Sequence, residues 1–132
     1  MTAPILVDTT GLYALLDRRD DCHGPAAETF GRLLVAGVPL VTHPYVVVET
    51  SALVQRRLPG GALHDLHRRL LAVIDVMAVP PGAFDRAVAG LIADPVGPSL
   101  VDRLSFEVAA LVGATSALAF DRHFVDAGLP AA

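Results

Sequence analysis

The chain contains no lysine, no asparagine and no tryptophan, and it has a single cysteine, Cys22. The lack of lysine excludes the phosphate-binding loop that ends in Gly-Lys-Ser/Thr, and it excludes kinase and Schiff-base chemistry. A single cysteine excludes a disulfide framework and a four-cysteine zinc site. Gly-x-Ser-x-Gly and Gly-x-Gly-x-x-Gly are also missing, so neither a hydrolase nucleophile elbow nor a dinucleotide fold is indicated.

Long apolar runs are missing too, although hydrophobic residues make up 53% of the 132 residues. The longest stretch without Asp, Glu or Arg runs from Leu33 to Val48 and contains two prolines, whereas a membrane span needs ~20 apolar residues. No signal-peptide pattern precedes Asp8. We therefore expect a single domain over residues 1–132 that is soluble and cytoplasmic and has no membrane partner.

The order of the expected elements indicates an α/β fold. Short apolar runs predict buried strands at residues 4–8, 39–42, 74–79 and 116–120. Helices are expected over residues 9–17, 25–36, 44–58, 62–71, 81–93 and 99–112. The valines after Pro44 would also suit a strand, and residues 121–124 are expected to form a turn. Strands that alternate with helices predict a short parallel sheet flanked by helices on both faces.

Four acidic residues are placed so that they can converge at one end of this sheet. Two of them directly follow predicted strands, and sites in parallel α/β folds form outside the carboxyl ends of the strands. The other two lie in helical segments with apolar neighbours. Carboxylates without cysteine or paired histidine favour Mg²⁺ or Mn²⁺ over Zn²⁺, and such a cluster suits phosphodiester hydrolysis. The candidate metal-binding and catalytic residues are Asp8, Glu49, Asp102 and Asp121.

Each acid also has a purely structural explanation. Asp8 is placed to cap a helix, Asp102 has the capping-box spacing from Ser99, and Asp121 could open a turn. Glu49 stands among apolar residues and, if buried, needs either a metal ion or an Arg from elsewhere in the fold. The net charge of −4 argues against binding nucleic acid by charge alone, unless two divalent cations cancel it.

Five segments carry a family resemblance: Ile5–Leu16, Asp20–His23, Val48–Val54 with Arg57 behind it, Ser99–Phe106 and Ala119–Phe124. In this order they resemble a PIN domain, and more closely the VapC-type toxins of toxin–antitoxin pairs. The resemblance implies a Mg²⁺-dependent endoribonuclease that acts on RNA and is inhibited by a VapB-type antitoxin. By position, it assigns the same acidic quartet to the active site.

Several finer expectations accompany this resemblance. Many relatives carry Thr or Ser two residues before the last acid, where this chain has Ala119. The missing hydroxyl is then expected from Thr9, Thr10 or Ser116. Arg56, two helical turns from Glu49, and its neighbour Arg57 are candidate RNA contacts. The apolar surplus predicts a surface covered by the antitoxin or by a second copy in a homodimer, although a compact core would also account for it.

Two other functions are open at this point. A PIN-like module that binds RNA or protein without catalysis would keep the fold, with Ala119 as a sign of lost activity, but the presence of all four acids argues against it. A haloacid-dehalogenase-like phosphatase would need Asp at the position of Thr10 and normally a lysine, and the chain has neither.

Overall fold

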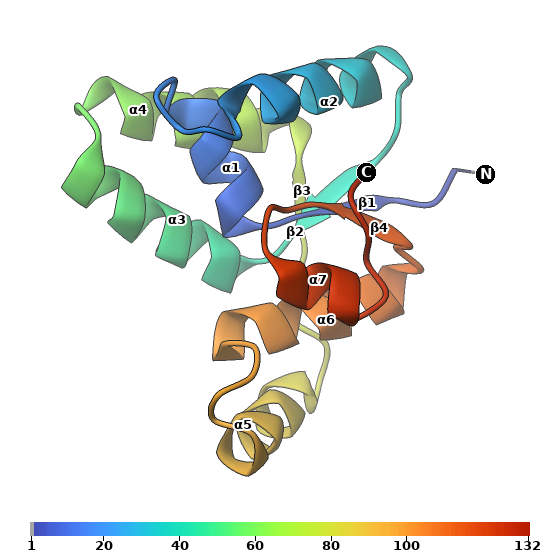
Figure 1. The fold of residues 1–132 in the computed structure, drawn as a ribbon. Coiled ribbons are helices and arrows are strands. Elements are labelled where there is room, and N and C mark those ends of the chain that lie inside the picture. Colours follow the sequence, from blue (N-terminus) through green and yellow to red (C-terminus); the bar gives the residue numbers. More distant parts are fainter. Residues whose placement is uncertain (1) are drawn as a thin grey trace.

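A parallel sheet between two groups of helices forms the centre of the computed structural model, which describes residues 2–132 (Figure 1). The strands are β1 (Ile5–Val7), β2 (Leu40–Thr42), β3 (Asp75–Val76) and β4 (Ser116–Leu118). They lie in the order β3-β2-β1-β4, so β1 and β2 are the central pair. The helices are α1 (Thr9–Leu16), α2 (His23–Val35), α3 (Pro44–Arg57), α4 (Gly61–His64), α5 (Ala83–Ala93), α6 (Leu100–Val112) and α7 (Arg122–Asp126).

Side chains of the strands alternate between two apolar clusters, one on each face of the sheet. Val7 packs with Leu12 of α1 and Val46 of α3 on one face. Leu6 packs with Val108 of α6 and Phe124 of α7 on the other. Both faces are covered, the central strand β1 is buried and apolar along its length, and the expected α/β sheet with helices on both faces is confirmed. Helix α5 packs against α6 and lies farther from the sheet (Figure 1).

The structure differs from the sequence-based expectation in three segments. The single helix expected over residues 62–71 is α4 followed by a π-helical turn, η1 (Asp65–Leu70), and a short 3₁₀ helix, η2 (Leu71–Val73). The strand expected over residues 74–79 keeps only the two residues of β3. The turn expected after Phe120 is helix α7, because the Asp121 side chain caps it and Phe124 is buried in the core. Within residues 2–132, no helix is long and apolar enough to cross a membrane.

The strand register brings three chain segments to one edge of the sheet. Val7 pairs with Leu118, and the Asp8 N–H donates to the Leu118 carbonyl oxygen at 3.1 Å. On the other side of β1, Leu6 pairs with Val41, so β2 ends beside the end of β1. The residues that follow β1, β2 and β4 therefore meet at the carboxyl edge of the sheet.

We predict that Gly11→Ala destabilises the fold by ~1–3 kcal/mol, because an added methyl group would overpack this edge. A Cβ atom at Gly11 would lie 2.3 Å from the Leu118 carbonyl oxygen, so α1 would have to move away from β4. Gly31→Ala in α2 is the matched control: no atom lies within 4 Å of its added Cβ, and alanine favours a helix by up to about 1 kcal/mol. Urea unfolding of both variants measures the difference, and equal free energies of unfolding would contradict the close approach.

Candidate active site

Asp8 is a buried carboxylate at the carboxyl end of β1, with 2% of its surface exposed. Its Oδ2 accepts hydrogen bonds from the Thr10 N–H at 3.2 Å and from the Thr10 hydroxyl at 2.8 Å, which caps α1. Its Oδ1 is buried and has no hydrogen-bond partner. An unpartnered buried carboxylate oxygen is costly, so this atom indicates a site that a cation or a donor would complete.

Asp102 and Asp121 also cap helices. Asp102 forms a capping box with Ser99: its N–H donates to Ser99 Oγ at 3.1 Å, and its Oδ2 accepts from the Ser99 N–H at 3.3 Å. Asp121 Oδ1 accepts from the His123 N–H at 2.9 Å and caps α7. These bonds fix the direction of each carboxylate and use only one of its oxygens.

Electrostatic interactions connect the four predicted acids through Asp102. Burial and, to a smaller extent, the charge of Asp102 raise the pKa of Asp8 to about 6 against the lowering effect of its hydrogen bonds. Burial also raises the pKa of Asp102, and the charges of Asp121 and Glu49 act in the same direction. Asp102 is therefore within electrostatic range of the other three acids, and their mutual repulsion is a cost that a cation would relieve.

Glu49 does not need a buried partner, contrary to the sequence-based expectation. The apolar run around it forms the helix α3 rather than a strand, and its side chain is exposed. The neighbours Val46 and Thr50 take the buried face of α3, which leaves Glu49 on the solvent side. Neither a metal ion nor an Arg is required to explain its position, and its contribution to the site is its charge near Asp102.

Thr10 provides a hydroxyl at the position where Ala119 lacks one. Its Oγ1 donates to Asp8 and accepts from the Phe120 N–H at 2.9 Å, so it joins β1 to the segment that precedes Asp121. Thr9 accepts a hydrogen bond from the buried Thr50 of α3 at 3.1 Å. Ser116 is too far away: it pairs with Ile5 at the start of β4, three residues before Asp8 at ~3.3 Å per residue.

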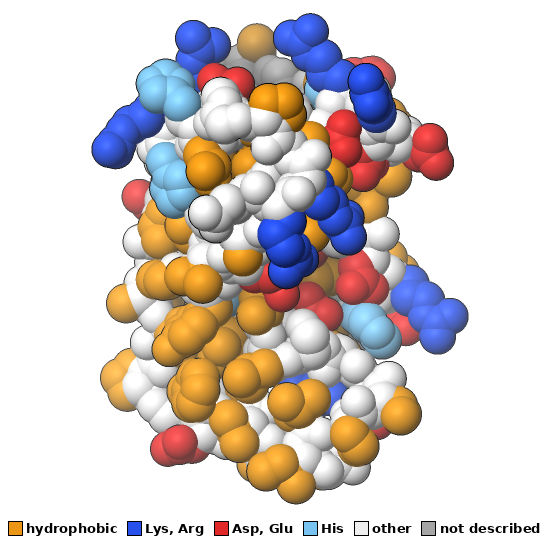
Figure 2. All heavy atoms as spheres, turned by 90° about the vertical axis from the view of Figure 1, so that its left-hand side faces the viewer, with side chains coloured by type: hydrophobic (Ala, Val, Ile, Leu, Met, Phe, Trp, Pro, Cys, Tyr) orange, Lys and Arg blue, Asp and Glu red, His pale blue; other side chains and the backbone are white. Residues whose placement is uncertain are grey.

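The two candidate RNA-contacting arginines differ in position. Arg57 lies over the Tyr13 ring at 5.8 Å from its centroid and lines a cavity together with Thr10 and Phe120. Arg56 is exposed on α3 and does not line this cavity. Figure 2 shows arginine side chains beside a group of acidic side chains on this face of the molecule. The geometry thus favours Arg57 over Arg56 as a neighbour of the acidic quartet.

His43 and Ser105 form a buried polar pair that the sequence analysis did not identify. His43 directly follows β2, is fully buried, and its Nε2 is 2.8 Å from Ser105 Oγ of α6. Burial lowers the pKa of His43 to about 4, so the ring is neutral near pH 7. In the sequence, His43 directly follows a predicted strand, as Asp8 does. This position is the signal by which His43 could have been identified. The pair ties the end of β2 to the helix that carries Asp102.

The donor set fits a hard divalent cation held by few protein ligands. Within residues 2–132, no three Asp, Glu, His or Cys side chains are arranged so that they could already hold one ion. Mg²⁺ typically keeps several waters and binds through one or two carboxylates plus substrate phosphates, so a closed cage is not required. The buried, unpartnered Oδ1 of Asp8, close to the charge of Asp102, is the observation that supports such a site.

Comparisons with known proteins agree with this arrangement. The family model of the PIN domain matches residues 5–129. The crystal structure of Mycobacterium tuberculosis VapC20, a toxin that cleaves the sarcin–ricin loop, is similar to this chain with a TM-score of 0.79 and 33% sequence identity. The match covers 95% of this chain and 95% of VapC20. Among curated protein sequences, none matches the chain.

We predict that Asp8→Asn stabilises the protein in the presence of a chelator at pH 8 by up to about 3 kcal/mol. Folding raises the pKa of Asp8 from 3.8 to about 6, so the folded state binds the proton more tightly than the unfolded state. The stability of the wild type therefore falls as pH rises from about 4 to about 6 and stays lower above that range. Asparagine removes the buried charge and still accepts the capping bond.

Urea unfolding of wild type and Asp8→Asn at pH 4 and pH 8 measures this difference. The gain should vanish near pH 4, where Asp8 is protonated in the folded protein. Asp21→Asn removes an exposed carboxylate as a control and should change stability by less than about 0.5 kcal/mol at either pH. An equal gain for Asp8→Asn at both pH values would contradict a buried, destabilising charge.

Proposed function

The chain belongs to the PIN domain family, and on this basis we propose that Asp8, Glu49, Asp102 and Asp121 form the active site of a divalent-metal-dependent endoribonuclease. The similarity to VapC20 over nearly the whole of both chains shows a ribonuclease toxin of the VapC type. The single observation that supports the site is the buried, unpartnered Oδ1 of Asp8, next to the charge of Asp102 at the carboxyl edge of the sheet.

Asp8 and Asp102 are the residues proposed to hold Mg²⁺, or Mn²⁺ in its place, because they are the two buried members of the quartet. When bound, such an ion activates a water molecule and stabilises the leaving oxygen of a phosphodiester. The residues of the chain prepare this site. Thr10 fixes Asp8 through Oδ2 and leaves Oδ1 directed away from the capping bonds, and Ser99 fixes Asp102 in the same way.

Glu49 and Asp121 have a different role in this proposal. Both are more accessible than Asp8, with Glu49 exposed and Asp121 half-buried. Their charges act on Asp102, and the carboxylate of Glu49 is suited to take up the proton that a hydrolytic water releases and to pass it to solvent. Arg57, at the rim of the adjacent cavity, offers guanidinium donors to the RNA strand.

The partners that we propose are RNA, a VapB-type antitoxin and a second copy of the chain. The acidic quartet would accept an arginine of an antitoxin, since a guanidinium matches carboxylate geometry. Apolar side chains lie exposed elsewhere on the surface, including Val48 at 66% and Ile92 at 74%. On the face of the molecule drawn in Figure 2, hydrophobic side chains gather in the lower part. Apolar surface of this kind is typical of a protein interface, which supports the antitoxin and the homodimer.

We predict that Mg²⁺ or Mn²⁺ raises the melting temperature of the protein. A cation that binds only the folded state stabilises it by mass action, and it relieves the repulsion that raises the pKa of Asp8 and Asp102. Thermal unfolding with and without the ion measures the increment, which Asp8→Asn combined with Asp102→Asn should abolish. Asp21→Asn combined with Asp126→Asn removes the same charge from two exposed positions and should keep the increment. The same increment in the first double variant would overturn the shared metal site.

We also predict that expression of the chain without an antitoxin arrests growth and that Asp8→Ala releases the arrest. Purified protein should cut a structured RNA with Mg²⁺ and stop when a chelator is added. A sarcin–ricin loop oligonucleotide is the first substrate to test, because VapC20 cleaves that loop. Asp21→Ala serves as the control that should remain toxic. If the wild type binds RNA and leaves it intact with every divalent ion tested, a non-catalytic binding module replaces the proposed function.

A further inference from the structure

A cavity of about 290 Å³ opens beside the acidic quartet, between the end of β4 and helices α1 and α3. Thr10 lines it, and the same Thr10 hydroxyl bonds Asp8. The cavity is also lined by residues from segments far apart in the sequence: Tyr13, Asp20, Leu53, Arg57 and Phe120. The cavity thus shares Thr10 and Arg57 with the proposed active site, whereas Tyr13, Asp20 and Leu53 take no part in the catalytic proposal.

We propose that this cavity binds one unpaired nucleobase of the RNA strand and selects guanine. The inference rests on the proposed ribonuclease function, because it assigns a substrate subsite next to the scissile position. Bases that leave the helical stack are commonly held by an aromatic or apolar surface and read on their polar edges. Phe120 and Leu53 provide the apolar surface, and Asp20 and Arg57 provide the polar groups.

Phe120 is the residue suited to stack on the base. Phe120 lines the cavity and is 39% exposed, so a base can reach it. Its N–H donates a hydrogen bond to Thr10 Oγ1 at 2.9 Å. The backbone of this aromatic residue is therefore fixed relative to Asp8. A base in contact with Phe120 would lie next to the carboxylates proposed to act on the adjoining phosphate. Stacking of this kind contributes ~1–3 kcal/mol per base and does not distinguish between bases.

Asp20 and Arg57 supply the selection. Asp20 Oδ1 accepts from the Cys22 N–H at 2.8 Å, which fixes a half-buried carboxylate at the cavity wall. Within residues 2–132, Asp20 has no ion-pair partner. Arg57 is held over the Tyr13 ring and still presents in-plane guanidinium N–H groups.

Guanine is the base whose edges match both groups. It has two adjacent donors, N1–H and the N2 amino group, that a carboxylate can accept, and its O6 and N7 are the acceptors that arginine reads most often. Adenine presents an N1 acceptor toward the carboxylate. Uracil has a single N–H between two carbonyl oxygens, and cytosine has one amino group beside an acceptor. A carboxylate and a guanidinium that line one cavity therefore favour guanine.

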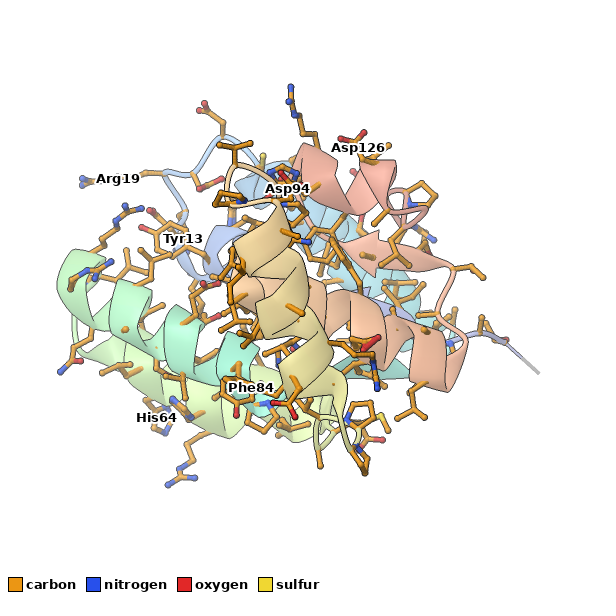
Figure 3. All side chains as sticks on the ribbon, turned by 90° about the horizontal axis from the view of Figure 1, so that it is seen from below. Tyr13, Arg19, His64, Phe84, Asp94 and Asp126 are labelled. Atoms are coloured by element: carbon orange, nitrogen blue, oxygen red, sulfur yellow. The ribbon has the colours of Figure 1, made fainter. Side chains whose placement is uncertain are left out.

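A second cavity, of about 390 Å³, continues from Arg57 and indicates the path of the RNA strand. Arg57 belongs to both cavities, and Arg18 and Arg19 line the second one. Figure 3 shows the side chain of Tyr13, a residue of α1, and that of Arg19, which extends toward solvent from the loop after α1. Arginines that line a cavity next to a base-sized one are suited to bind the phosphates of the neighbouring nucleotides. The base subsite is thus flanked by acids on one side and by arginines on the other.

The test measures binding without cleavage. Fluorescence anisotropy in chelator compares pentaribonucleotides of uridine whose central base is guanine, inosine, adenine, cytosine or uracil. We expect guanine to bind at least about tenfold more tightly than adenine, cytosine and uracil, with inosine, which lacks the N2 amino group, in between. Equal affinity for all five oligonucleotides would overturn the proposal.

Matched variants locate the selection at the cavity. Asp20→Asn should reduce the preference for guanine to within about twofold, whereas Asp21→Asn, which removes the same charge one residue later at an exposed position, should keep it. Arg57→Gln should weaken guanine binding, and Arg56→Gln should keep the base preference. Phe120→Ala should weaken all five oligonucleotides alike. A guanine preference that survives Asp20→Asn in full would overturn the role of Asp20.

The outcome is separable from that of the proposed function. If the wild type cuts RNA with Mg²⁺ and binds the five oligonucleotides equally, the ribonuclease stands and the base subsite fails. If it prefers guanine in an Asp20-dependent way and cuts no RNA, the subsite stands and the catalytic proposal fails.

Discussion

The acidic end of the sheet depends on one hydroxyl group, that of Thr10. It donates to Asp8 at 2.8 Å and accepts from the Phe120 N–H at 2.9 Å, and so it connects two segments that are 110 residues apart in the chain. The strand register alone would bring β1 and β4 together. The hydroxyl adds a fixed relation between the Asp8 carboxylate, the aromatic ring that follows β4 and, one residue later, Asp121. It thus adds to the bond from the Asp8 N–H to the Leu118 carbonyl oxygen, which joins the same two segments.

Capping and a catalytic role are compatible in this fold. Three of the four acids cap a helix, each through one oxygen: Asp8 and Asp102 as their sequence positions predict, and Asp121 where the sequence predicted a turn. A capped carboxylate has a fixed rotamer, and its second oxygen stays available. For Asp8 this second oxygen is buried and unpartnered, which is unfavourable for a residue that serves only as a cap. Helix capping therefore explains how the acids are oriented, and the cost at Asp8 supports the proposed second role of that residue.

The sequence predicts the sheet, its parallel strands and most helices, because both faces of the sheet are covered and most strand residues are apolar. For the same reason it places Asp8 and Asp121 at one edge of the sheet, since residues after parallel strands share an edge. It does not predict the exposure of Glu49, because a run of valines fits a helix with one buried face as well as a strand. The sequence does not predict helix α7, because the burial of Phe124 in the core depends on the tertiary fold.

The cavity beside the acids could not be predicted from sequence for a related reason. Its walls come from the α1–α2 loop, from α3 and from the segment after β4, and no local pattern connects Asp20 with Phe120. The stripe Glu49, Leu53 and Arg57 on α3 is visible at a spacing of four residues, but only the packing of α1 against α3 shows what it faces.

At the rim of this cavity, Arg57 provides positive charge beside the four carboxylates. A polyanionic strand is repelled by the four carboxylates when no cation is bound, and it is attracted by Arg57 and by the loop arginines Arg18 and Arg19. The strand is thus held from the arginine side, and a cation among the carboxylates would remove the remaining repulsion. Binding of RNA and binding of metal should therefore strengthen each other, because each lowers the electrostatic cost of the other.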